Sequence, residues 1–181
     1  CYNESLKQNK ALLTGTALNN MGNIYFKAGN YEGAVDYYRR SIPFLDSMQD
    51  YNTLAECYYG LAKAFDKLNK PDSALHFAKN SFTLSTDNQF LKHSINASQF
   101  LTELFKNQNN IDSAFAYQQI FMVSKESFDN AEKVKELQNL TITEQLRQQE
   151  IAEQKIAEAK QRKLRLELLF VGMAIPILFL G

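Results

Sequence analysis

The stretch "MGNIYFKAGNYEGA" (residues 21–34) decides the fold, because it joins two helical patterns through a short break. Small and aromatic residues recur at helical spacing on both sides of Gly29 and Asn30. A glycine inside the first pattern, Gly22, costs about 1 kcal/mol of helix propensity relative to alanine, which the close approach of a second helix can offset. We therefore expect two antiparallel helices joined by a tight turn.

The same pattern returns along the chain, because alanines stand at Ala34, Ala74 and Ala114, each 40 residues after the last. Three further columns stay in phase with these alanines: Gly22, Ala62 and Thr102; Tyr25, Phe65 and Phe105; Met21, Leu61 and Leu101. Pro71 falls at the first position of an expected helix, where its missing N–H is harmless and its fixed φ fits. The repetition predicts three helical hairpins and an all-α fold.

The repeated columns resemble the tetratricopeptide repeat (TPR), a helical-hairpin unit that usually has about 34 residues. The resemblance is carried by Leu18, Met21, Gly22, Tyr25, Gly29, Tyr31, Ala34 and Tyr38; by Tyr58, Leu61, Ala62, Phe65, Pro71 and Ala74; and by Ser98, Leu101, Thr102, Phe105, Ile111 and Ala114. The family's helix-terminating proline is absent. The longer period predicts longer helices, or longer loops near 46–53 and 85–91.

The resemblance implies a solenoid of stacked helical hairpins over residues 1–128. Its expected parts are a partial repeat at 1–14 and full repeats at about 15–47, 52–85 and 91–128. The fold class implied for the whole chain is an all-α, TPR-type helical-hairpin solenoid, followed by a long helix and a truncated transmembrane helix.

Residues 129–165 are expected to form the long charged helix. No Gly or Pro occurs between residues 130 and 171, and strong helix formers dominate. A helix over 131–165 would be about 50 Å long at about 1.5 Å per residue. Its apolar residues form no clean heptad pattern, so three arrangements stay open: a coiled-coil homodimer through 131–165, a solvated single helix, or a helix folded back on the repeats.

Residues 166–181 are expected to begin the transmembrane helix. From Leu168 to Gly181 no charged residue occurs. A helix needs about 20 apolar residues to span a bilayer, and the run still continues at residue 181. We therefore interpret the chain as a fragment; the alternative for this segment is a buried core helix. Basic residues precede the run, and the positive-inside rule taken alone would place the repeats in the cytoplasm.

Composition and motifs argue against several function classes. Lys+Arg and Asp+Glu both number 20, so the formal charge of zero gives no electrostatic argument for nucleic-acid binding. The two cysteines and the two histidines, His76 and His93, show no metal-ligand spacing. The sequence contains no glycine-rich phosphate loop and no nucleophile elbow. We therefore expect this segment to have no catalytic residue, no metal and no cofactor.

The resemblance also implies a binding surface, because the first helices of stacked hairpins line a concave face that binds extended peptides. The groove residues implied by the family's columns are Asn19, Asn20, Asn23, Lys27, Tyr59, Lys63, Lys67, Gln99 and Glu103, together with Thr16, Glu56, Asn96 and Asn107. The amides of Asn20 and Asn23 carry donors and acceptors that suit a peptide backbone; the alternative is that they are solvated surface residues. Gly60 and Phe100 stand where the chaperone-binding clamp would need polar residues, so that pattern is not met.

The order of repeats, charged helix and apolar run resembles the sensory half of membrane-bound TPR sensor histidine kinases or regulators of the Bacteroides type. This resemblance implies a single-pass membrane protein whose TPR region is periplasmic, with the cytoplasm as the alternative side. The implied function is a sensor module that binds a protein, peptide or other ligand and relays through the helix to an output domain absent from this chain. A histidine kinase could follow residue 181. The alternative is a tail-anchored cytoplasmic TPR scaffold without an output domain.

Overall fold

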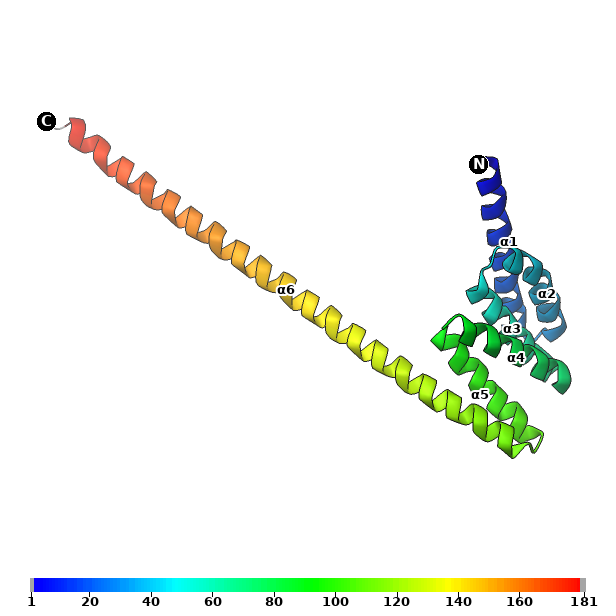
Figure 1. The fold of residues 1–181 in the computed structure, drawn as a ribbon. Helices are drawn as coiled ribbons and strands as arrows, with labels where there is room; N and C mark the ends of the chain where they lie inside the picture. Colours follow the sequence, from blue (N-terminus) through cyan, green and yellow to red (C-terminus); the bar gives the residue numbers. More distant parts are fainter. Residues whose placement is uncertain (1, 180–181) are drawn as a thin grey trace. The chain divides into compact units, whose positions relative to one another are not determined.

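The computed structural model describes residues 2–179 and the side chains of residues 10–168, and this part of the chain is helical apart from short turns (Figure 1). The helices are α1 (Tyr2–Lys27), α2 (Tyr31–Ser47), α3 (Tyr51–Lys67), α4 (Pro71–Asp87), α5 (Leu91–Asn107) and α6 (Ile111–Phe179). The chain divides into two compact units, Cys1–Asp129 and Asn130–Gly181. The prediction of all-α helical hairpins followed by a long helix is confirmed.

The first unit has a regular rhythm of helix and turn. Helices α2, α3, α4 and α5 each contain 17 residues, and three residues separate each helix from the next. The middle residue of every turn has a positive φ: Gly29, Gln49, Asn69, Gln89 and Asn109. Two such steps account for the repeat of 40 residues. Of the two alternatives predicted for the lengthened period, longer helices are confirmed, and longer loops near 46–53 and 85–91 are wrong.

Each turn closes the preceding helix by the same hydrogen bonds. The N–H of Asn30 donates to the carbonyl oxygen of Tyr25 at 3.0 Å, and the N–H of Gly29 donates to that of Phe26 at 3.0 Å. This is the Schellman arrangement, in which a left-handed residue lets the chain satisfy the last helical carbonyls. Asn30 then caps the next helix, because its Oδ1 accepts from the N–H of Gly33 at 2.9 Å.

The start of the chain differs from the prediction. A boundary was expected between a partial repeat at 1–14 and a full repeat from residue 15, but α1 runs unbroken from Tyr2 to Lys27. No residue around Gly15 has the positive φ that marks the turn after each of the helices α1 to α5. Gly15 is instead buried inside the helix, where an added Cβ would lie 2.9 Å from the Cβ of Phe44 in α2.

Small and aromatic residues build the core of the first unit. Ala34 and Ala74 are fully buried and Ala114 is 2% exposed, so the backbones of paired helices approach closely at the repeated alanine column. Aromatic pairs recur with the same spacing: the rings of Phe65 and Phe77 stack at 5.5 Å, and those of Phe105 and Tyr117 stack at 5.6 Å. The third hairpin therefore repeats the packing of the second.

The ring of Tyr38 on α2 lies between two helices that belong to different hairpins. A Cβ added to Gly22 of α1 would lie 2.5 Å from Tyr38 Cδ1, and one added to Gly60 of α3 would lie 2.5 Å from Tyr38 Cζ. Tyr38 is only 1% exposed. Both glycines are therefore required by the close approach of this ring, which resolves why Gly22 is tolerated in mid-helix.

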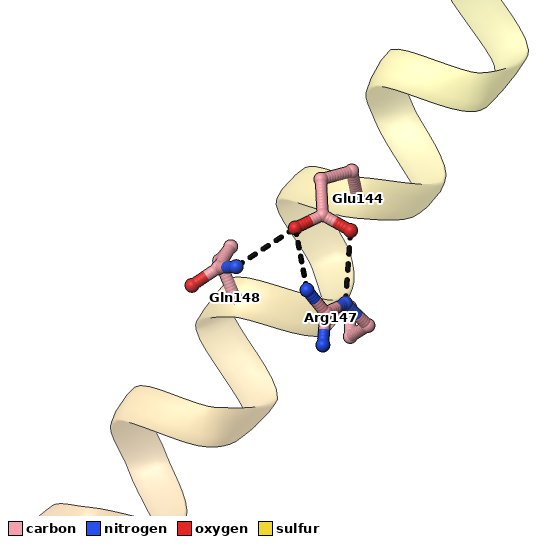
Figure 2. A network of polar contacts seen from close by, with 3 residues as sticks. All are labelled: Glu144, Arg147 and Gln148. Atoms are coloured by element: carbon pink, nitrogen blue, oxygen red, sulfur yellow. Dashed lines mark hydrogen bonds and ion pairs between the residues drawn. The ribbon is translucent and has the colours of Figure 1, made fainter.

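In the second unit, the described side chains of residues 130–168 are exposed except for the half-buried Ile151. Figure 2 shows one group that stabilises this solvated helix: the guanidinium of Arg147 donates twice to the carboxylate of Glu144 at 2.8 Å, and Gln148 Nε2 donates to it at 2.7 Å. Such pairs one turn apart stabilise an exposed helix only slightly.

The expected start of a transmembrane helix at 166–181 falls mostly on residues 169–181, whose side chains lie outside the described part of the structure. Within the part that is described, no helix has a stretch both long and apolar enough to cross a bilayer. The membrane interpretation of 166–181 thus remains a prediction from the sequence.

Replacing Ala74 by Leu should destabilise the first unit, because Ala74 is fully buried where α3 and α4 pack. Overpacking of this kind costs about 1–3 kcal/mol. Urea denaturation followed by circular dichroism measures the loss. The matched control is Ala116→Leu, the same change at an exposed helical alanine, which should leave stability nearly unchanged. Equal effects at both positions would show that the alanine column does not set the helix spacing.

Replacing Gly60 by Ala should destabilise the protein by about 1–3 kcal/mol through overpacking against Tyr38, although alanine is the better helix former by about 1 kcal/mol. In a Tyr38→Leu background, which lacks the atoms that the new Cβ would meet, the same change should be neutral or stabilising. A double-mutant cycle by urea denaturation measures this coupling. Identical effects in the two backgrounds would refute the proposed ring contact.

Candidate functional site

A cavity of about 280 Å³ lies among the first helices of the three hairpins, α1, α3 and α5. Its lining residues are Asn23, Glu56, Tyr59, Gly60, Lys63, Lys92, His93 and Asn96. Most of these side chains are polar and half-buried. A concave site with convergent polar groups contributed by several elements is typical of ligand binding.

A chain of hydrogen bonds holds one side of this cavity. The hydroxyl of Tyr38 donates to Asn23 Oδ1 at 2.7 Å, and Asn23 Nδ2 donates to Glu56 Oε1 at 3.0 Å. Burial raises the pKa of Tyr38 above its ordinary value, so this phenol remains a donor at neutral pH. The chain fixes the Asn23 amide and directs the Glu56 carboxylate from the buried core toward the cavity.

Two aromatic rings hold the ammonium group of Lys63. Its Nζ lies 4.6 Å from the ring centroid of Tyr59 and 5.0 Å from that of Phe26. Tyr59 is itself held edge-on against Phe100, with ring centroids 5.9 Å apart. Burial lowers the pKa of Lys63, while the Glu56 carboxylate opposes that shift. Lys63 is thus a positioned, partly desolvated cation, and such cations interact more strongly than fully solvated ones.

The third wall of the cavity comes from the first turns of α5. His93 Nε2 lies 3.2 Å from Asn52 Oδ1 of α3, a distance at which the ring N–H can donate to the amide oxygen. Burial lowers the pKa of His93, so the neutral form prevails at neutral pH. Lys92 adds a second cation at the cavity and pushes the pKa of His93 in the same direction.

The structure brings together several of the groove residues expected from the sequence. Asn23, Tyr59 and Lys63 line the same cavity, as do Glu56 and Asn96. Two further residues lie close enough to influence its charges without lining it. Lys27 lowers the pKa of Lys63, and Glu103 raises the pKa of Tyr59.

The remaining expected residues lie elsewhere. Asn20, Lys67 and Gln99 are exposed and do not line the cavity. Asn19 is only 1% exposed, and its Oδ1 accepts no hydrogen bond from any described residue. The structure therefore places Asn19 inside the fold, where its side chain cannot present itself to a ligand in the groove.

Sequence reasoning missed Lys92 and His93 because it compared equivalent columns of the repeat. Asn23 meets Glu56, which is 33 residues further along the chain, instead of the residue 40 further. The cavity is lined by the end of α1, the middle of α3 and the start of α5, so earlier columns of each later helix face the groove. Applying this shift of seven residues, about two helical turns, would have pointed toward the start of α5.

A second cavity, of about 380 Å³, lies near the ends of α3 and α5 and the start of α4. It is lined by Asp66, Asn69, Pro71, Leu104, Asn107 and Gln108, which belong mainly to turns and helix ends. It contains no positioned cation or hydrogen-bonded relay of the kind at Asn23 and Lys63. In the part of the chain that the structure describes, no three His, Cys, Asp or Glu residues gather as metal ligands would.

Comparisons with known proteins identify the repeat. Residues 13–87 match the model of the tetratricopeptide repeat family. A search of curated proteins gave no match. Among solved structures, the C-terminal TPR-containing domain of a Plasmodium falciparum protein of the FK506-binding type is similar, with 16% identity, a TM-score of 0.41 and coverage of 70% of this chain and 95% of that chain. At that identity and TM-score, this match informs neither ligand nor partner.

The family match covers the first two hairpins, and the third hairpin repeats their turns and aromatic stacking outside the matched residues. TPR units are interaction modules without catalytic groups, and their partners are proteins. Residues 13–87 of this chain therefore match the tetratricopeptide repeat, a protein-interaction module.

Proposed function

We propose that the cavity formed by α1, α3 and α5 binds an extended peptide segment of a partner protein. The observation that carries the proposal is the convergence of half-buried polar side chains from three helices on one concave site. Amide, carboxylate and ammonium groups stand side by side there. This mixture of donors and acceptors suits a peptide backbone with polar side chains better than an apolar small molecule.

The hydrogen-bonding capacity left in the cavity supports a peptide ligand. Asn23 uses one amide N–H on Glu56 and one lone pair on Tyr38, which leaves one N–H and one lone pair. Asn96 has a free amide at the cavity wall, since it makes no side-chain hydrogen bond with a described residue. Lys63 Nζ, which lies near the rings of Tyr59 and Phe26, can donate to a carbonyl or carboxylate of the ligand. Because Lys63 is already positioned, its ordering costs little on binding.

The test uses peptides selected from a displayed random library against the 181-residue chain, with dissociation constants measured by fluorescence anisotropy. Lys63→Gln should weaken binding about tenfold, which is the effect of losing about 1.4 kcal/mol. Asn96→Ala should weaken it as well. The matched control is Lys67→Gln, one turn further along α3 and exposed outside the cavity, which should change binding less than about twofold.

Circular dichroism must show that each variant keeps its helix content and melting curve. If the selected peptides bind Lys63→Gln as tightly as the parent, the proposed site is wrong. If Asn107→Ala weakens peptide binding and Asn96→Ala does not, the peptides bind in the second cavity, which Asn107 lines.

We further propose the finer role of a sensor module that passes a binding signal along α6. This proposal is supported by the helix itself, which begins in the third hairpin at Ile111 and continues to Phe179. Attachment to a membrane through 166–181, and an output domain beyond it, belong to the same proposal and rest on the sequence resemblance. The alternative remains a scaffold that binds partners without signalling.

Cross-linking of single cysteines tests the relay. In a background with Cys1 and Cys57 replaced by Ala, cysteines are placed at Ala152, Ile156 and Ala159 and oxidised in membranes. A homodimeric relay through 131–165 should give cross-links that peak on one helical face. Failure to cross-link at every position would make this segment a passive connection and favour the scaffold.

A further inference from the structure

The two junctions between hairpins use the same columns of the repeat. At the first junction the guanidinium of Arg39 on α2 lies 5.4 Å from the ring centroid of Phe65 on α3. At the second, Nζ of Lys79 on α4 lies 5.5 Å from the ring centroid of Phe105 on α5. These pairs are related by the repeat of 40 residues. The second helix of each hairpin therefore meets the first helix of the next hairpin in one constant way.

These junctions bury apolar residues on both sides. On the second helices, Val35 is 9% exposed and Leu75, Ile42 and Phe82 are half-buried. On the first helices, Ala64 is fully buried and Leu104 is 4% exposed. The same columns continue into the two outer helices of the unit, α1 and the first part of α6.

The outward face of α6 repeats the apolar columns of α2 and α4 but leaves them uncovered. Phe115, in the column of Val35 and Leu75, is 61% exposed, and Met122, in the column of Ile42 and Phe82, is 55% exposed. Ile111 on the same face is 67% exposed. Contiguous exposed apolar residues of this kind mark interaction surfaces.

The outward face of α1 repeats the columns of α3 and α5 in the same way. Ile24, in the column of Ala64 and Leu104, is 57% exposed, and Leu13 on the same face is 69% exposed. Between them lies Asn20, in the column of Gly60, which is also exposed. This face is the type of surface that α3 offers to α2 inside the chain.

The polar residues of the two outer faces are also matched. Inside the chain Tyr38 lies against Gly60. Gln118 on α6 occupies the column of Tyr38, and Asn20 on α1 occupies the column of Gly60. Two exposed amides would thus face each other if α6 met an α1 helix by the same geometry, and amides can hydrogen-bond to each other.

We propose that the outward face of α6, residues 111–122, binds the outward face of α1, residues 13–24, of a second copy of this chain. The contact continues the junction that α2 and α3, and α4 and α5, already make within one chain. Because the two faces are different surfaces of the same molecule, the contact is head-to-tail and each bound copy still offers one free face.

Sedimentation velocity of the 181-residue chain over a concentration series tests this contact. The parent should form species that grow beyond a dimer, as an open head-to-tail contact requires. Ile24→Glu blocks only the α1 face, and Phe115→Glu blocks only the α6 face. Each variant alone should stay monomeric even at ten times the concentration at which the parent begins to associate. An equimolar mixture of the two should form a 1:1 dimer and no larger species.

The matched control is Leu140→Glu, because Leu140 is 61% exposed like Phe115 but lies in the second unit. It should associate as the parent does. A monomeric parent, a blocked variant that still assembles alone, or a mixture that fails to dimerise would overturn the proposal. Loss of association in Leu140→Glu alone would place the contact in the long helix and overturn it as well.

Discussion

The arrangement of the first unit depends on the space that Gly22 and Gly60 leave for the ring of Tyr38. A Cβ at either glycine would lie only 2.5 Å from an atom of the ring, which is too close for a carbon–carbon contact. The ring of Tyr38 on α2 therefore sets the spacing of α2 from both α1 and α3. The hydroxyl at the far end of the same ring then donates to Asn23, which donates to Glu56. Core packing and groove geometry are therefore one constraint.

The helices and turns could be predicted from the sequence because their causes are local. Gly29 and Asn30, Asn69 and Asn109 are residue types that favour a left-handed turn, and Pro71 suits a helix start. Gln49 and Gln89 give no such signal, yet adopt the same conformation. At those two turns the repeat spacing, through the packing of the helices on either side, imposes a conformation that the residues alone do not favour.

The groove could be predicted only in part, because it depends on how one hairpin packs against the next. Asn23, Tyr59 and Lys63 were found from their columns, and the cavity contains all three. Column reasoning could not predict that Asn19 would be buried or that His93 would line the cavity, since both follow from how the helices pack. Gly60 shows the same limit: it is a missing clamp residue in sequence, but in the structure it is the site where Tyr38 fits.

The long helix, unlike the groove, is determined by local causes and not by tertiary packing. Its composition is sufficient to make it helical, and the bonds among Glu144, Arg147 and Gln148 are all within one turn. Of its exposed apolar residues, Ile142 and Leu146 lie about 40° apart around the axis at about 100° per residue, but Leu137 lies about 140–180° away from them, so the three form no single stripe for a partner. In contrast, Ile111, Phe115 and Met122 fall within one narrow sector of α6. Specific association of this chain therefore has a stronger physical basis at the faces of the repeats than along the charged helix.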